Sequence, residues 1–283
     1  MGNFQAARPR LEAAGRCRLP ESQTLTPQDP GVAALVLLAP LLRITGNPTA
    51  ALDALTGGLR RAEELAFPIG PFTRAYAHTY AAWFSQLSSD PKGAKEHAEV
   101  AIAISKEYGY ATWLAAGTFH QAIASSWLDS PAAAVPQIEA CVAGWQGAGA
   151  NLFLPYLLLS LGDARRRAGD VVGARRAVEE GLAHTTGRDE RFMEAELLRL
   201  RGVLAFELDP AHPEAAEADL LGAIQVARRQ GARTFELRAA ASLHSLKRSP
   251  ESGEMLSRVL ASFTDTSSMR ELDDARALWE GAA

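Results

Sequence analysis

The amino-acid sequence predicts an all-α fold, a solenoid of antiparallel helix pairs, from three observations. The first is a short phrase that occurs seven times, with a polar residue, often followed by proline, and a small residue four places after the polar one. A polar N-cap followed by proline suits a helix start, because the cap oxygen accepts a hydrogen bond from a free amide and proline has no amide hydrogen to leave unpaired. The copies begin at Asn3, Asn47, Asp90, Ser130, Asp170, His212 and Ser249.

The second observation is the spacing of the copies. Consecutive copies are 44, 43, 40, 40, 42 and 37 residues apart. Periods of this size are typical of helical solenoids, in which each repeat contacts only its neighbours. We therefore expect one continuous array: an incomplete first repeat and a loop at 1–31, about six helix pairs at 32–265, and a capping helix and tail at 266–283.

The phrases also predict the bounds of the helices. Each phrase starts the second helix of a pair, and the apolar segment before it forms the first helix. Gly109, Gly149, Gly187 and Gly231 follow second helices and are expected as left-handed C-caps. A closing helix is expected from Ser268 to Trp279. The expected pairs are 32–45 with 48–66, 72–88 with 91–108, 111–128 with 131–147, 152–168 with 171–186, 190–208 with 213–230, and 233–246 with 250–263.

The third observation is a row of small side chains. In most copies, an apolar residue lies four places after the small residue and another small one lies seven places after it, as in Ala174, Val178 and Gly181. This spacing puts the three side chains on one helix face, where small residues let a second helix approach closely. The preceding helices carry a matching position twelve residues earlier, at Ala39, Ala82, Ala122, Gly162, Leu204 and Ala241.

This register resembles the tetratricopeptide family, whose paired helices carry small residues at corresponding positions. The resemblance implies a right-handed superhelix with the first helices on its inner, concave wall. The family period of about 34 residues is shorter, so longer helices or loops are implied. HEAT-type repeats fit the length better but do not require this register. Two stretches, Glu194 to Gly202 and Ala227 to Leu243, also resemble the C-terminal repeat region of large bacterial signalling ATPases, which implies a sensor or docking region.

Composition points to an ordinary folded protein that does not attract polyanions. Hydrophobic residues make up 47% of the chain and charged residues 22%, and the net charge of -4 provides no field that attracts nucleic acid or an anionic membrane. Cys17 and Cys141 show no metal or redox spacing, which favours a reducing cytoplasm. The most apolar run, Val32 to Leu42, is too short to span a bilayer. We therefore expect a cytoplasmic protein with neither nucleic acid nor membrane as a partner.

Motifs of catalysis are missing from the sequence. It contains no phosphate-binding Gly-Lys-Ser or Gly-Lys-Thr, no His-Glu-x-x-His and no Gly-x-Ser-x-Gly, and its six histidines are scattered. Asp273 and Asp274 do not complete an acidic metal box. These observations predict a protein that is not an enzyme, with no cofactor, no metal and no catalytic residue.

The remaining candidate for a functional site is the inner, concave wall of the array that the resemblance implies. Aromatic residues and arginine are enriched where proteins bind partners, and arginine can hold a carboxylate with two hydrogen bonds. The register predicts that the first part of the groove along this wall is aromatic and that its second part carries arginines. The alternative is that the aromatic rings pack between repeats and the arginines pair with local acids. The candidate groove residues are Tyr76, Trp83, Phe119, Trp127, Tyr156, Asp163, Arg166, Arg201 and Arg238.

The function predicted from this wall is a non-enzymatic interaction or regulatory module of a bacterial signalling protein. Its groove would bind a peptide or protein segment with an apolar part and an acidic part, from a separate protein or from a domain of its own parent protein. Because the chain opens at a second-helix phrase, its uncapped first repeat also predicts a possible homodimer. The alternative function is a small-molecule sensor whose ligand binds in the superhelical groove.

Overall fold

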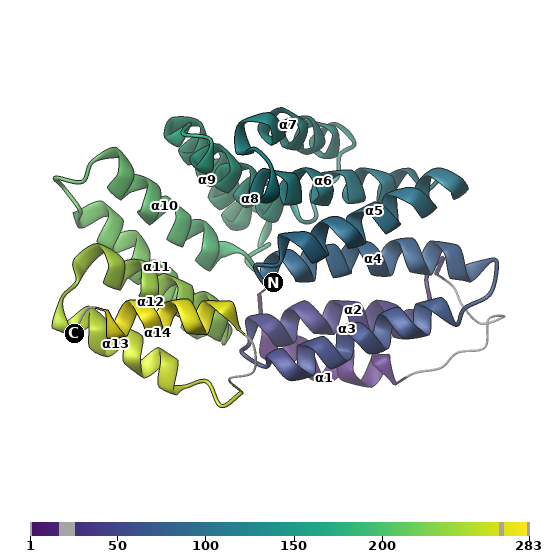
Figure 1. The fold of residues 1–283 in the computed structure, drawn as a ribbon, viewed down its shortest axis with the longest axis horizontal. Helices are drawn as coiled ribbons and strands as arrows, with labels where there is room; N and C mark the ends of the chain where they lie inside the picture. Colours follow the sequence, from purple (N-terminus) through teal and green to yellow (C-terminus); the bar gives the residue numbers. More distant parts are fainter. Residues whose placement is uncertain (1, 17–25, 266–268, 282–283) are drawn as a thin grey trace. The chain divides into compact units, whose positions relative to one another are not determined.

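The computed structural model describes residues 2–16, 26–265 and 269–281, and every regular element in these ranges is a helix (Figure 1). This confirms the all-α prediction. Observed helix ends agree with the expected ones within a few residues. The helices are α1 (Phe4–Gly15), α2 (Pro30–Ile44), α3 (Pro48–Glu63), α4 (Ile69–Leu87), α5 (Pro91–Tyr108), α6 (Ala111–Leu128), α7 (Pro131–Gly147), α8 (Leu154–Arg167), α9 (Val171–Arg188), α10 (Glu194–Leu208), α11 (Glu214–Gln230), α12 (Arg233–Lys247), α13 (Pro250–Ala261) and α14 (Arg270–Glu280).

Helix starts follow the repeated phrase in most copies. The carboxylate of Asp90 accepts a hydrogen bond from the amide of Gly93 at 3.0 Å, and Asp170 accepts one from Gly173 at 2.8 Å. Ser130 and Ser249 cap α7 and α13 in the same way. These caps satisfy amides that have no partner within the helix.

The His212 copy works differently. Helix α11 begins at Glu214 after Pro213, which makes no side-chain cap hydrogen bond. The ring of His212 instead contacts Asp209, Nδ1 to Oδ2 at 3.0 Å. Helix α11 therefore starts without a polar side-chain cap, and the fixed φ of Pro213 is compatible with a helix start.

Helix ends confirm part of the glycine prediction. Gly109 and Gly231 are left-handed C-caps of α5 and α11. Gly149 is also left-handed but lies one residue beyond the C-cap of α7. Gly187 was predicted wrongly, because it lies inside α9 and Asp189 takes the left-handed position.

The small residues lie where the helices of a pair meet. Ala51, Ala94, Ala134, Ala174 and Ala216 are at most 3% exposed. The burial of Ala51, Ala94, Ala174 and Ala216 confirms the small-residue register in four pairs, since a larger side chain would hold the second helix away from the first.

Two glycines show how closely the paired helices approach. A Cβ atom added at Gly162 of α8 would lie 2.9 Å from Val178 Cγ2 of α9. At Gly202 of α10 it would lie 2.9 Å from the carbonyl oxygen of Ala216 of α11. Both separations are shorter than van der Waals contact, so these positions accept no side chain unless the helices move apart.

The last pair departs from the predicted register by one residue. Gly253 and Ser257 are only partly buried, whereas Ser252 and Leu256 are 3% and 0% exposed. The same shift occurs in α12, where Ala240 is 1% exposed and the predicted Ala241 is half-buried. Both helices are therefore shifted by one residue in the same direction.

Contacts divide the chain into two compact units. The N-terminal unit comprises Phe4–Asp129, and the C-terminal unit comprises Ser130–Ala283 with the first three residues. Within the N-terminal unit, α4 packs on its partner α5 and on the preceding pair α2 and α3. Within the C-terminal unit, α12 packs in the same way on α13 and on α10 and α11. The continuity of a single array stays a prediction.

Helix α14 takes the place of a first helix of a further pair. It packs on α12 and α13 as α12 packs on α10 and α11. Leu272 and Ala275 bury its inner face, at 0% and 2% exposed. Ser268, the expected start of this helix, lies outside the described residues. None of the helices described here has the length and apolar character needed to cross a membrane.

The close approach at Gly202 predicts an unusual response to alanine. Gly202→Ala should lower the free energy of unfolding by about 1–3 kcal/mol, because the new methyl group meets the backbone of α11. The control is Gly222→Ala in α11, where the nearest atom to the new Cβ is 4.0 Å away, and it should raise stability by about 0.5–1 kcal/mol. Urea denaturation of both variants measures this difference. Equal stabilisation by the two alanines would contradict the observed packing.

Candidate functional site

Most of the predicted aromatic residues are buried in helix packing. Tyr76, Trp83, Phe119 and Tyr156 are each at most 7% exposed, whereas Trp127 is 58% exposed. The expectation that the first four rings lie open on a groove wall is therefore corrected. Large aromatic side chains at helical spacing fill the space between neighbouring helices, where they gain most from leaving water. A role in binding stays a prediction for all five.

The predicted charged residues are engaged by other charged residues. Arg166 Nε donates to Glu207 Oε1 at 2.9 Å, which joins α8 to α10. Arg201 forms a two-pronged pair with Asp219, with Nε to Oδ2 at 2.8 Å. Asp163 accepts from Arg167 at 3.0 Å. The three arginines predicted for the second part of the groove, called the arginine stripe below, therefore form ion pairs within the fold and do not present free positive charge.

The ion pair of Arg201 lies within its own helix pair. Its partner Asp219 belongs to α11, the second helix of the same pair, so the guanidinium reaches across the pair. The register counted from Leu204 could not show this, because an arginine side chain is long enough to leave the face on which its Cα lies.

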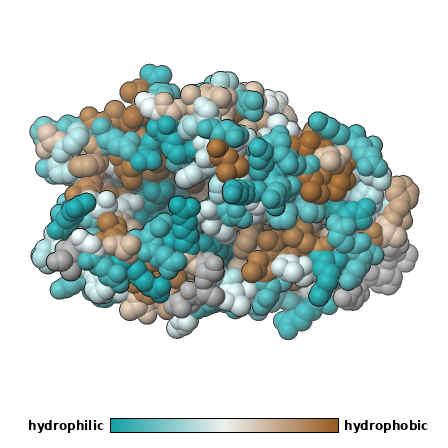
Figure 2. All heavy atoms as spheres, viewed as in Figure 1, coloured by the Kyte–Doolittle hydropathy of each residue, from teal (hydrophilic) through white to brown (hydrophobic). Residues whose placement is uncertain are grey.

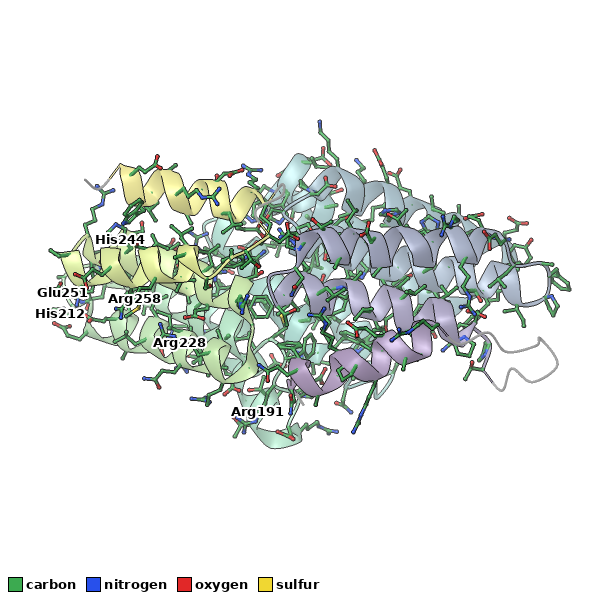
Figure 3. All side chains as sticks on the ribbon, turned by 90° about the horizontal axis from the view of Figure 1, so that it is seen from below. Arg191, His212, Arg228, His244, Glu251 and Arg258 are labelled. Carbon is green, nitrogen blue, oxygen red and sulfur yellow. The ribbon has the colours of Figure 1, made fainter. Side chains whose placement is uncertain are left out.

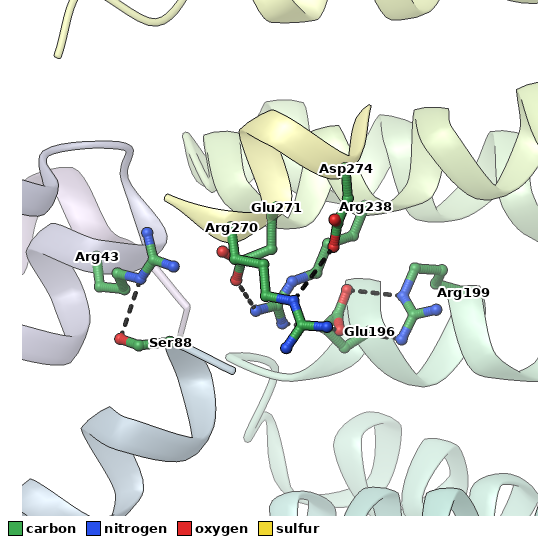
Figure 4. Close-up of polar contacts among 8 residues, drawn as sticks. All are labelled: Arg43, Ser88, Glu196, Arg199, Arg238, Arg270, Glu271 and Asp274. Carbon is green, nitrogen blue, oxygen red and sulfur yellow. Dashed lines mark hydrogen bonds and ion pairs between the residues drawn. The ribbon is translucent and has the colours of Figure 1, made fainter. Parts of the chain in front are cut away.

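Arg238 lies at the centre of a buried ionic network (Figure 4). Its Nη1 contacts Glu196 Oε2 at 3.3 Å, and its Nη2 contacts Glu271 Oε1 at 2.5 Å. Arg199 Nε donates to the other oxygen of Glu196 at 3.0 Å. Burial alone would raise the pKa of Glu196, but the charges and hydrogen bonds of Arg199 and Arg238 hold it below its usual value. The network joins α10, α12 and α14.

An aromatic cluster occupies α4 and α6 in the N-terminal unit. Ring centroids of Tyr76 lie 4.7 Å from Tyr80 and 5.0 Å from Trp113, and Phe72 lies 5.8 Å from Trp113. Tyr76 is buried, while Phe72, Tyr80 and Trp113 are half-buried, and Tyr80 and Trp113 pack against the core cluster that contains Tyr76. The aromatic edge is the name used below for Phe72, Tyr80 and Trp113.

The aromatic edge combines apolar surface with hydrogen-bonding groups. The indole Nε1 of Trp113 is buried and has no hydrogen-bond partner among the described residues. Burial raises the pKa of Tyr76 and of Tyr80, so both phenols stay protonated at neutral pH. Such a surface can contact an apolar group and donate hydrogen bonds to carbonyl oxygens. Sequence analysis selected Tyr76 alone of these four residues, although the spacing of Phe72, Tyr76 and Tyr80 by four residues placed them on one helix face.

Two histidines form a pair beside this cluster. Nδ1 of His78 in α4 lies 3.0 Å from Nδ1 of His97 in α5, so one ring donates and the other accepts. Burial lowers the pKa of His78 to about 4, with a further contribution from His97 and from Arg74. Glu63 lies 3.8 Å from the other ring nitrogen of His78. In the described part of the chain, no three His, Cys, Asp or Glu side chains converge on a point that could hold a metal ion.

Comparison with known proteins identifies the fold. No family model matches the chain, and no curated protein matches it either. Among solved structures, NprR in complex with its cognate peptide NprX matches with a TM-score of 0.59 and 12% identity, over 96% of this chain and 75% of that one. A Signal Transduction ATPase with Numerous Domains from Pyrococcus horikoshii, which has a tetratricopeptide repeat sensor, matches with a TM-score of 0.52 and 10% identity. That match covers 99% of this chain and 44% of the other chain.

These similarities confirm the predicted class of fold. The chain has the helical-array fold of a protein with a tetratricopeptide repeat sensor, as the small-residue register indicated. At 12% and 10% identity the likeness establishes the fold, and function has to be argued from this chain's own residues.

Removing Arg238 should destabilise the C-terminal unit strongly. Arg238→Met leaves the carboxylates of Glu196 and Glu271 buried without this charge partner, which typically costs about 3–5 kcal/mol. The control Arg166→Met breaks an ion pair whose side chains are 33% and 32% exposed, and it should cost less than about 1 kcal/mol. Thermal unfolding measures both variants. Similar small losses would show that the network contributes little.

The histidine pair predicts acid sensitivity of the N-terminal unit. The pKa of His78 is about 4 in the folded state and about 6.5 in the unfolded state, so only the unfolded chain takes up this proton as the pH falls below 6.5. The stability of the wild-type protein should therefore fall as the pH is lowered from about 6.5 to about 4. The stability of His78→Gln should fall less over the same range. Melting temperatures across this range measure the effect, with His212→Gln at an exposed histidine as the control. Parallel curves for wild type and His78→Gln would contradict the prediction.

Proposed function

We propose that this chain is a non-catalytic interaction module that binds a peptide or protein segment on its first helices. The observation that carries the proposal is the aromatic edge on α4 and α6, a half-exposed apolar surface with an unsatisfied indole N–H. Aromatic residues that are partly desolvated before binding are common anchors in protein interfaces. The likeness to NprR, a structure with a bound peptide, supports a peptide as the ligand class.

The chemistry of the aromatic edge defines the segment it would bind. Phe72, Tyr80 and Trp113 offer ring surface to an apolar side chain. An acidic part of the ligand, which the arginine stripe suggested, has less support, since Arg166, Arg201 and Arg238 already hold carboxylates. We therefore propose an apolar, largely uncharged segment.

The similarity of this chain to a signalling protein suggests a source for the bound segment. The tetratricopeptide repeat sensor of the Pyrococcus horikoshii protein belongs to a longer chain, of which this chain matches 44%. The proposed role is regulatory, in a bacterial cytoplasmic signalling system, with the segment supplied by another protein or by the parent protein of this chain. Pairing of two copies through the first repeat stays a prediction.

A selected peptide tests this proposal. Peptides enriched from a random library on the immobilised protein should contain apolar residues, and Trp113→Ala should weaken their binding at least tenfold, as loss of an interface anchor does. The control is Leu52→Ala, an exposed apolar residue on α3 of the same unit, which should bind like wild type. Fluorescence polarisation with a labelled peptide gives both affinities. No enrichment of any peptide, or equal binding by Trp113→Ala and wild type, would overturn the proposal.

A further inference from the structure

An open cavity of about 790 Å³ lies in the C-terminal unit where α12, α13 and the end of α14 meet. It is separate from the aromatic edge, which belongs to the other unit. His244 lines the cavity together with Arg248, Glu254, Arg258, Trp279 and Glu280. His244 and Arg258 are labelled in Figure 3. The size is within the range of small-molecule sites.

His244 carries an unsatisfied ring nitrogen in this cavity. The side chain is 3% exposed, and its Nδ1 lies 2.9 Å from Ser252 Oγ. Its Nε2 is buried and has no hydrogen-bond partner among the described residues. A buried polar atom without a partner costs free energy, which a bound ligand that hydrogen-bonds to it would recover.

The hydrogen bonds around Ser252 determine which ligand group this nitrogen needs. Ser252 Oγ donates its single hydrogen to the carbonyl oxygen of Ser249 at 2.9 Å. His244 Nδ1 is then the donor to Ser252, and in the neutral tautomer with its hydrogen on Nδ1 the other nitrogen, Nε2, is an acceptor. The same bond makes Ser252 unsuitable as a nucleophile, since His244 gives it a proton and cannot remove one. The cavity therefore needs a ligand with an O–H or N–H donor.

Two arginines supply positive charge at the cavity. Arg248 and Arg258 are exposed. Arg258 Nε donates to the backbone carbonyl oxygen of Glu254 at 3.3 Å, and no ion pair to either arginine is found in the described part of the chain. They differ in this respect from Arg166, Arg201 and Arg238, which are all paired. Unpaired guanidinium groups bind phosphate or carboxylate oxygens with paired hydrogen bonds.

Trp279 completes the cavity with an aromatic surface. Its side chain is 43% exposed, on the last turn of α14. A planar ring can stack on an exposed indole. Glu254 and Glu280 add acceptors that can take hydroxyl or amine donors.

The geometry points to a binding site for a small anionic ligand that carries a planar ring and a hydroxyl or amine donor. Phosphate or carboxylate would lie against Arg248 and Arg258, the ring against Trp279, and the donor against His244 Nε2. A nucleoside monophosphate and an aromatic amino acid both have this chemistry. This site is independent of the proposed peptide surface.

NMR titration of the full chain tests the site. The indole N–H signal of Trp279 is assigned with Trp279→Phe, and AMP, tryptophan and inorganic phosphate are added separately. At least one of the first two should shift the signal saturably, and inorganic phosphate should bind at least tenfold more weakly because it has no ring. A shift with AMP alone identifies the phosphate, and a shift with tryptophan alone identifies the carboxylate.

Matched arginine variants exclude a general charge effect. Arg258→Gln should weaken binding at least tenfold, whereas Arg229→Gln, which removes the same charge from an exposed position on α11, should not change it. His244→Phe should weaken binding too, and Arg258→Gln provides the test if that core variant does not fold. No saturable shift with any probe at 10 mM, or equal loss in Arg258→Gln and Arg229→Gln, would overturn the inference.

Discussion

Close contact between paired helices is the constraint on which the rest of this structure depends. At Gly162 and Gly202 there is no room even for a methyl group, and the buried alanines at equivalent positions of other pairs leave room for little more. Close contact brings backbones together over the length of two helices and removes apolar surface from water on both. Because each pair is held this way, the outer faces of its first helix are left to pack on the next pair. The aromatic rings on α4 and the charged residues on α10 and α12 occupy those faces.

The two units use these faces in different ways. In the N-terminal unit aromatic rings fill the space between first helices, and Tyr80 and Trp113 are half-buried. In the C-terminal unit the corresponding contacts include ion pairs, with Arg238 holding carboxylates from α10 and α14. A ring edge can exchange water for a ligand at little cost, whereas a buried ion pair is broken only at a high cost. This difference is why the aromatic edge is the stronger candidate for a partner surface.

The sequence predicted the helices well because their signals are local. A cap such as Asp170 and the small residue Ala174 after it act within one turn, and their spacing is visible in the chain. The side-chain contacts were less predictable because they join distant segments: Arg238 meets Glu196 across 42 residues. A long side chain also chooses among several partners, which is why the predicted arginine stripe proved to be paired. The cavity at His244 was missed for the same reason, since three helices form it and none carries a motif.

Nuclear Overhauser effects across the paired helices test the central contact most directly. In a methyl-labelled sample, the α protons of Gly162 should show strong cross-peaks to a γ-methyl group of Val178, and those of Gly202 to a δ-methyl group of Leu220. Gly222, whose nearest neighbour is 4.0 Å from a Cβ position, should show weaker cross-peaks to Leu198. Strong signals at the first two sites would support helix pairs held by small residues in register. If these cross-peaks are absent in the folded protein, the close contact between paired helices is contradicted.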